Sequence, residues 1–126
     1  MWSVGCVLAE LLGRKPFFPG KNFVHQLQLI FNVIGAPRPS EISNVRNRQA
    51  RKFLDSVKTK PKVAFSHIFP TPKHSREAAS VLECLLVFKP AHRMSARALL
   101  DNHPYFDNLS YAKKPIVDPV PPRTDF

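Results

Sequence analysis

The sequence predicts an all-α fold made of short helices joined by stiff, proline-containing connections. Apolar residues recur at helical spacing in several segments. Residues that favour helix ends stand at the borders of these segments, and no stretch shows the strict alternation typical of a strand. The 126 residues include 13 prolines against 4 glycines, which favours many short elements over one long bundle. A chain of this length is one domain or part of one.

Residues 1–12 are predicted to form a helix that is apolar on almost every side. Its apolar side chains are Trp2, Val4, Cys6, Val7, Leu8, Ala9, Leu11 and Leu12. A helix of this kind belongs in the middle of a core, so Trp2, Gly5 and Cys6 are interpreted as packing residues and not as a ligand site. Gly13 is expected to end the helix.

A second helix is predicted to begin after Asn22, whose side chain can cap it, and to end at Gly35, shortly before Pro37. Its apolar stripe consists of Phe23, Leu27, Ile30 and Phe31, widened by Leu29, Val33 and Ile34. This stripe is expected to pack against the core.

A third, more polar helix is predicted from Ser40 to about Val57. One of its faces is basic and carries Arg46, Arg48, Arg51 and Lys52. The net charge of the chain is +10, from 19 Lys and Arg against 9 Asp and Glu, so this face is a candidate surface for an anionic protein or lipid headgroup. A solvated face is the plainer interpretation. Because Phe53 is the one aromatic residue among these cations, base stacking is not indicated and nucleic acid is disfavoured.

A fourth helix is predicted to begin after Ser75 and to stop before Pro90, and a short fifth one is predicted from Ser95 to Leu100. The helical pattern dissolves beyond residue 106. The chain is therefore divided into a helical domain over residues 1–106 and an irregular, proline-rich extension over residues 107–126.

Neither a metal site nor a catalytic cluster is indicated. The five histidines show no paired metal spacing. Cys6 and Cys84 stand in apolar surroundings without C-x-x-C spacing, which favours buried free thiols in a reducing compartment. Glu77 and Glu83 are expected to face solvent. No segment suits a membrane span or a signal peptide, so the cytosol, the nucleus or both are the expected locations.

Two segments resemble the eukaryotic protein kinase family. Trp2-Ser3-Val4-Gly5-Cys6 looks like the start of the central buried helix of the kinase C-lobe. Arg93, in Pro90-Ala91-His92-Arg93, is similar to the arginine that forms a structural ion pair with a glutamate at the end of the activation segment. The resemblance covers nearly the whole chain and implies the helical second half of that lobe.

More specific segments resemble the MAP kinase and cyclin-dependent kinase branch. They are Pro16-Phe17-Phe18-Pro19-Gly20-Lys21, Gln26-Leu27 and Ile34-Gly35-Ala36-Pro37. The roughly thirty residues before Phe69-Pro70 are similar to the MAP kinase insertion. One departure lies in the extension, where Lys113 and Lys114 stand in place of the acidic cluster with which many MAP kinases dock basic peptides.

The resemblance implies a parent serine/threonine kinase of signal transduction, which uses ATP and magnesium, phosphorylates protein substrates and is activated by upstream kinases. The Gly-rich loop, strand lysine, catalytic loop and D-F-G segment of that family do not occur here. No catalytic, cofactor-binding or metal-binding residue is therefore assigned to this chain, which is expected to bind neither cofactor and to be inactive alone. The alternatives are a non-catalytic interaction module derived from a kinase lobe and, further off, a basic helical nucleic-acid binder.

Overall fold

The computed structural model describes residues 1–107 and confirms the all-α fold. Within this range there are seven α-helices, two short 3-10 helices and no strand. The α-helices are α1 Trp2–Gly13, α2 Phe23–Ile34, α3 Pro39–Ile42, α4 Arg48–Ser56, α5 Phe65–Ile68, α6 Arg76–Leu85 and α7 Ala96–Asn102, and the 3-10 helices are η1 Pro90–His92 and η2 Pro104–Phe106. None of these helices is long and apolar enough to cross a membrane. From residue 108 on, the predicted proline-rich extension lies outside the described residues.

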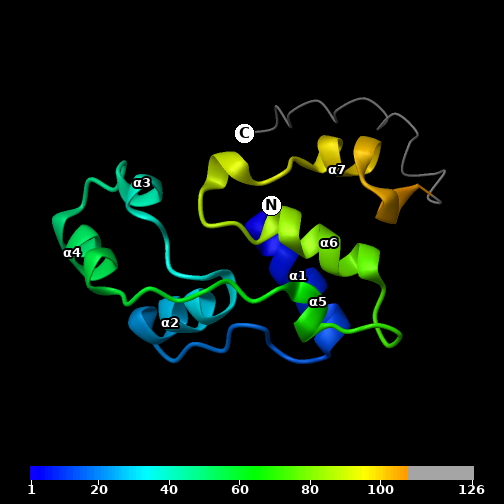
Figure 1. The fold of residues 1–126 in the computed structure, drawn as a ribbon, viewed down its shortest axis with the longest axis horizontal. Helices are drawn as coiled ribbons and strands as arrows, with labels where there is room; N and C mark the ends of the chain where they lie inside the picture. Colours follow the sequence, from blue (N-terminus) through cyan, green and yellow to red (C-terminus); the bar gives the residue numbers. More distant parts are fainter. Residues whose placement is uncertain (108–126) are drawn as a thin grey trace, which may run out of the picture.

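The helices form two regions that are joined by extended connections (Figure 1). In the first region α6 contacts α1, α5 and η2, and α7 packs on η2. In the second region α3 contacts α4, and both lie on the far side of α2 from the first region (Figure 1). The connection after α4 returns past α2, so residues 60–63 run beside the end of that helix.

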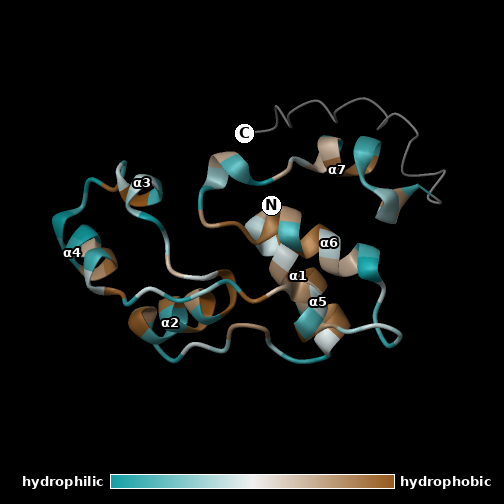
Figure 2. Ribbon diagram, viewed as in Figure 1, coloured by the Kyte–Doolittle hydropathy of each residue, from teal (hydrophilic) through white to brown (hydrophobic). Residues whose placement is uncertain are grey.

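Helix α6 supplies more residues of the hydrophobic core than any other helix of the described chain. Its residues Val81, Leu82, Leu85 and the adjoining Leu86 are each at most 2% exposed. Leu82 and Leu86 pack with Ala9 of α1 and Phe65 of α5, whereas Val81 and Leu85 pack with Leu99 of α7. Burial of one such Leu or Phe side chain contributes about 1.5–3 kcal/mol. The hydrophobic colouring in Figure 2 is accordingly dense where α1, α5 and α6 meet.

The predicted helix caps are confirmed at three positions. The side-chain oxygens of Asn22, Ser75 and Ser95 accept hydrogen bonds from the backbone N–H groups three residues later, at 2.9, 2.9 and 3.1 Å. Each cap satisfies a donor that the first helical turn leaves without a partner, which is worth about 1 kcal/mol. α7 then runs to Asn102, two residues beyond the predicted end.

The first helix differs from its prediction at its C-terminal end. It includes Gly13 and ends at Arg14, which adopts the left-handed conformation with φ 56°. One side is also open to solvent within the described part of the chain, since Val4, Val7 and Leu11 are 53%, 56% and 71% exposed. An apolar helix of this kind requires cover on every side, and the described residues cover only part of it.

The single helix predicted from Ser40 to Val57 is also wrong, because this segment forms α3 and α4 with a break between them. The Asn47 side chain accepts a hydrogen bond from the Ala50 N–H at 2.9 Å and so starts a new helix. Asparagine competes for backbone groups in this way and favours helix ends over helix interiors.

The short helix α5 was not predicted. Phe23, expected in the apolar stripe of α2, is 92% exposed.

Candidate functional site

Arg93 lies at the junction between α1 and the segment that follows α6. Its Nε donates to the Val87 carbonyl at 2.8 Å and its Nη2 to the Phe88 carbonyl at 3.0 Å. The guanidinium lies 5.0 Å from the centre of the Trp2 ring, a distance at which a cation is attracted to the ring face. Within residues 1–107 no carboxylate forms an ion pair with Arg93. The ion pair that the resemblance implies stays a prediction.

An apolar cleft opens beside Arg93. Its volume is about 310 Å³, and it is lined by Trp2, Leu27, Ile30, Phe31, Ile34, Phe88 and Arg93. The middle of the α2 stripe therefore faces this cleft, where the Phe31 and Phe88 rings lie 6.1 Å apart. Apolar walls with one cation at the edge suit a chain segment that presents an acidic side chain among apolar ones.

Gly5 and Cys6 serve packing, as the sequence indicates for an apolar helix. A Cβ atom at Gly5 would stand 2.8 Å from Leu86 Cδ2 and 3.1 Å from Leu85 Cβ, so glycine allows α1 to approach α6 closely. Cys6 and Cys84 are free and only partly buried. Partial burial raises the pKa of both thiols, with smaller contributions from Glu10 at Cys6 and Glu83 at Cys84. Neither thiol has the lowered pKa of a nucleophile.

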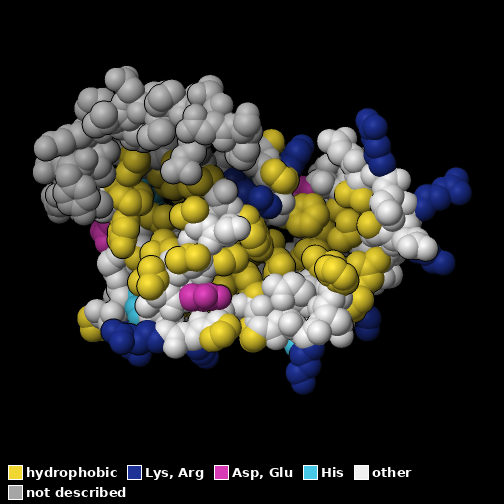
Figure 3. Space-filling view, turned by 180° about the vertical axis from the view of Figure 1, so that it is seen from behind, with side chains coloured by type: hydrophobic (Ala, Val, Ile, Leu, Met, Phe, Trp, Pro, Cys, Tyr) yellow, Lys and Arg dark blue, Asp and Glu magenta, His cyan; other side chains and the backbone are white. Residues whose placement is uncertain are grey.

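The predicted basic face is dispersed in the structure. Arg46, Arg48 and Lys52 are exposed, whereas Arg51 donates to the Ile42 carbonyl at 3.1 Å and pairs with Asp55 at 3.4 Å. Figure 3 shows Lys and Arg side chains standing out separately around the edge of the molecule, with hydrophobic side chains between them. These residues do not converge on one point.

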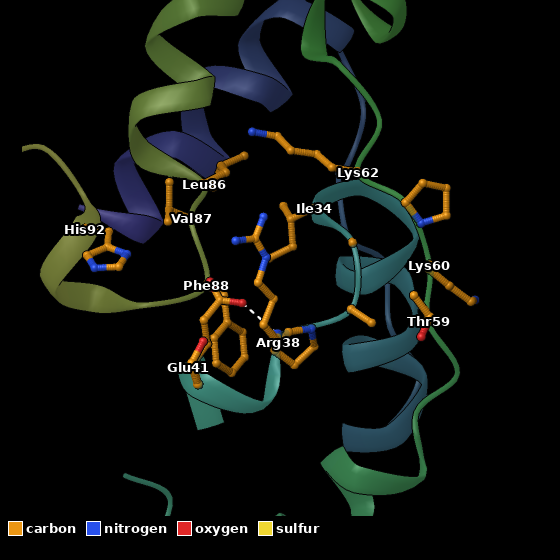
Figure 4. Close-up of a pocket in the computed structure, with 15 residues that line it drawn as sticks. Ile34, Arg38, Glu41, Thr59, Lys60, Lys62, Leu86, Val87, Phe88 and His92 are labelled. Carbon is orange, nitrogen blue, oxygen red and sulfur yellow. Dashed lines mark hydrogen bonds between the residues drawn. The ribbon is translucent and has the colours of Figure 1, made fainter. Parts of the chain in front are cut away.

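A larger cavity of about 590 Å³ lies between the end of α2, residues 59–62 and the segment after α6 (Figure 4). Two backbone hydrogen bonds hold its sides together, from Ala36 to the Lys60 carbonyl at 3.2 Å and from Val63 to the Val33 carbonyl at 2.8 Å. Gly35 permits this approach, because its φ is 83° and a Cβ there would lie 3.0 Å from the Lys60 carbonyl oxygen.

The cavity gathers cations that sequence reasoning did not combine. Arg38, Lys60, Lys62 and His92 all line it, together with one acid, Glu41. None of these cations belongs to the basic face that the sequence predicts over Arg46, Arg48, Arg51 and Lys52. A charge count along the chain misses the grouping, because it depends on how the loop after α4 returns beside α2.

Glu83 is not the solvent-facing residue expected from the sequence. Its carboxylate accepts a hydrogen bond from the Phe65 N–H at 3.0 Å and forms an ion pair with Lys62. It therefore ties the start of α5 and the loop before it to α6. Glu77 is exposed, as expected.

The described residues do not form a set of side chains like those with which kinases bind ATP and magnesium. Across residues 1–107, no group of three or more His, Cys, Asp or Glu side chains is placed to hold a metal ion. Gly5, Gly13, Gly20 and Gly35 lie apart in the sequence and form no glycine-rich phosphate loop. No step of phosphoryl transfer is assigned to these side chains.

Comparison with known proteins identifies the family. Residues 1–106 match the protein kinase domain. The chain is 46% identical over 109 residues to extracellular signal-regulated kinase 1 of Dictyostelium discoideum, covering 86% of this chain and 20% of that protein. It is 47% identical over 121 residues to mitogen-activated protein kinase 8 of Arabidopsis thaliana, covering 95% and 20%. It is 44% identical over 121 residues to mitogen-activated protein kinase 16 of Oryza sativa subsp. japonica, covering 95% and 24%.

The chain thus spans about a fifth of the length of these relatives. Two of these matches extend over 95% of the chain and therefore through both regions of the structure. The chain belongs to the protein kinase family and is MAP kinase-like within it.

Proposed function

We propose that these residues serve a MAP kinase-like serine/threonine kinase, which transfers the γ-phosphoryl group of ATP to a protein hydroxyl with the help of magnesium. In this proposal the chain supplies the foundation of the helical lobe and part of the surface that faces the protein substrate. The groups that position the phosphates and the metal belong to segments other than residues 1–126. By itself the chain is therefore expected to have no kinase activity, since phosphoryl transfer depends on those groups.

The observation that carries this proposal is the cleft beside Arg93. Its walls are apolar, and the guanidinium at its edge is held by the Val87 and Phe88 carbonyls and the Trp2 ring but by no carboxylate among residues 1–107. A partly buried cation of this kind favours an acidic partner. The end of an activation segment, with its glutamate, is the partner that kinase membership suggests.

The open side of α1 supports the same proposal. Val4, Val7 and Leu11 are each more than half exposed, and a contiguous apolar face on one helix calls for a covering element. Further segments of a kinase lobe are the proposed cover.

The cytosol, the nucleus or both are the proposed locations, and upstream kinases are the proposed activators.

The start of α2 is the proposed part of the substrate-facing surface. Phe23 is 92% exposed and Val24 is 48% exposed, although both are apolar. Solvent-exposed aromatic side chains next to a helix start are well suited to bury an apolar side chain of a protein substrate.

The proposal is tested by determining the transcript sequence upstream of the Met1 codon and by assaying both proteins. We expect an in-frame reading frame with a catalytic loop, a D-F-G segment and an aspartate shortly before Trp2. The longer protein should phosphorylate a generic basic protein substrate in the presence of magnesium and ATP, and the 126-residue chain should not. A stop codon immediately upstream, or activity of the highly purified chain alone, would contradict the proposal.

A non-catalytic interaction module is the second candidate, because the exposed Phe23 and Val24 suit a partner protein as well as they suit a substrate. The two candidates differ in what Phe23→Ser changes. In a kinase, the substitution should raise the KM for a protein substrate and leave kcat for a short peptide unchanged. In a module, it should weaken partner binding in a protein that has no transferase activity.

A further inference from the structure

The cavity between the end of α2 and the segment after α6 has the size of a ligand site and is open to solvent on the side of its cations. Its volume of about 590 Å³ falls within the range of roughly 300–1,000 Å³ that is usual for small-molecule sites. It is far larger than a single inorganic ion requires. Three separate stretches of chain build its walls, and the hydrogen bonds of Ala36 and Val63 hold two of these stretches together.

Arg38 is the cation that this cavity presents. In Figure 4 its side chain crosses the middle of the cavity and its guanidinium lies among the lining residues. Within the described residues that guanidinium has neither a recorded hydrogen bond nor an ion pair, and Glu41 accepts the Arg38 backbone N–H at 2.7 Å. The one acid of the lining therefore binds the main chain of Arg38 and not its side chain.

The other charged groups around the cavity are partly engaged. Lys62 runs along one border and pairs with Glu83, and Lys60 turns away from the cavity and donates to the Asn32 side chain (Figure 4). Three cations, Arg38, Lys60 and Lys62, surround the cavity together with two acids, Glu41 and Glu83. Without His92, the surroundings therefore carry one excess positive charge. The field therefore favours an anion, and Arg38 is the group available to bind it directly.

The rest of the lining is partly apolar. It includes Ile34, Leu86, Val87 and Phe88. A ligand that fills the cavity therefore combines an anionic group with an apolar or weakly polar body. A phosphate monoester suits the anionic part, because it carries about −1.5 to −2 charges near pH 7 and accepts two parallel hydrogen bonds from a guanidinium.

We propose that this cavity is a binding site for an organic phosphate monoester, with Arg38 holding the phosphate and Ile34, Leu86 and Phe88 contacting the group that carries it. The phosphate can be borne by a modified side chain of a protein or by a small phosphorylated molecule, and both present the same chemistry to the site. The site adjoins the cleft beside Arg93, with which it shares the lining residues Ile34 and Phe88.

Binding is measured by fluorescence anisotropy of a labelled phosphotyrosine peptide, titrated with the purified 126-residue chain. Matched phosphoserine and unphosphorylated peptides test the phosphate and its carrier. Phenyl phosphate, O-phosphoserine and inorganic phosphate serve as competitors. We expect the phosphorylated peptides to bind, phenyl phosphate to compete better than inorganic phosphate, and the unphosphorylated peptide to bind at least about tenfold more weakly. Competition by phenyl phosphate at the affinity of the peptide itself would identify a small-molecule site, and much weaker competition would identify a peptide site.

The matched variants are Arg38→Gln and Arg46→Gln, which change the net charge of the chain equally. Both arginines are exposed, and only Arg38 lines the cavity. Arg38→Gln should weaken phosphopeptide binding about tenfold or more, since it removes a charge-assisted hydrogen-bond fork. Arg46→Gln should change it less than about twofold, as expected of a screened surface charge. Arg38→Lys should give an intermediate loss, because it keeps the charge and removes the fork.

Circular dichroism of each variant checks that the fold is retained. Chemical-shift mapping on the unmutated chain locates the site independently, and we expect shifts at Gly35, Ala36 and Phe88. The proposal is overturned if the phosphopeptide does not bind at millimolar concentration, if phosphorylation makes no difference, if Arg38→Gln and Arg46→Gln weaken binding equally, or if the shifts fall outside the cavity.

Discussion

The two regions of this chain use the same helical spacing of apolar residues with different results. In the first region, α6 buries Ala78, Ala79, Val81, Leu82 and Leu85. In the second region, α4 buries no residue, and α3 buries Ile42 alone. A periodic apolar pattern therefore specifies a helix in both regions but a core in only one of them, because burial depends on how many other elements pack around the stripe.

The second region is held mainly by local polar contacts. Asn47 caps α4, Arg51 connects α4 to the last carbonyl of α3, and Glu41 binds the backbone of Arg38. Contacts of this kind contribute about 0.5–1.5 kcal/mol each when they are exposed to water. The second region is expected to open at lower free energy than the core around α6. The predictions below test this difference or the packing of the core region itself.

The largest expected difference is between two leucines. Leu82→Ala removes a side chain that is 0% exposed and in contact with α1 and α5, so it should lower the free energy of unfolding by about 2–5 kcal/mol. Leu54→Ala, in a helix without buried residues, should lower it by less than about 1.5 kcal/mol. Urea denaturation followed by circular dichroism measures both. Equal losses would mean that the second region is packed as tightly as the first.

The next comparison concerns two arginines. Arg93→Ala removes two partly buried hydrogen bonds to the Val87 and Phe88 carbonyls and the contact with the Trp2 ring, and about 1.5–3 kcal/mol of stability should be lost. Arg46→Ala, at an exposed position, should stay within about 0.5 kcal/mol of the original protein.

Arg93 also tests the kinase assignment. In a longer protein that supplies the expected glutamate, Arg93→Ala should lower stability by about 3–5 kcal/mol, because a buried carboxylate is left without its partner. The thermal unfolding of both proteins gives the comparison. If Arg93→Ala lowers the stability of both proteins equally, the Val87 and Phe88 carbonyls and the Trp2 ring are the only groups that hold Arg93, and the expected glutamate does not pair with it.

Two glycines of α1 make a sharper test within the core region. Gly5→Ala places a methyl group 2.8 Å from Leu86 Cδ2 and should destabilise the chain by about 1–3 kcal/mol through overpacking. Gly13→Ala meets Phe69 Cε1 at 3.4 Å, an ordinary contact, and should be neutral or stabilise by up to about 1 kcal/mol through helix propensity. If both variants melt at the same temperature as the original chain, α1 does not approach Leu85 and Leu86 as closely as in the structure.

The smallest expected effect lies in the second region. Asp55→Asn removes the ion pair with Arg51, in which both side chains are more than one third exposed. The change in unfolding free energy should be about 0.5 kcal/mol or less and should disappear at high salt. A larger effect that persists in 1 M salt would show that this pair is shielded from water and that α4 is more tightly packed than its exposure indicates.

Several features were determined by the sequence alone because their causes are local. An Asn or Ser residue just before a helical pattern can cap the helix, because its side chain reaches a backbone donor only three residues away. Asn22, Ser75 and Ser95 do so here. The apolar stripes of α1, α2 and α6 likewise follow from spacing alone. Trp2, Gly5 and Arg93 carry the resemblance to protein kinases, and the family comparison confirms it.

Other features were decided only by the tertiary structure because their causes are distant in the chain. The exposure of Phe23 depends on what lies beside the start of α2 and not on the apolar pattern of that helix. Glu83 is drawn from solvent by Lys62 and by the start of α5, some twenty residues before it. Arg38 meets Lys62 and Phe88 because Gly35 lets the end of α2 approach the returning loop. The sequence shows which residues are charged. Whether charges from three segments come together depends on packing, which follows from the burial of apolar surface over the whole fold.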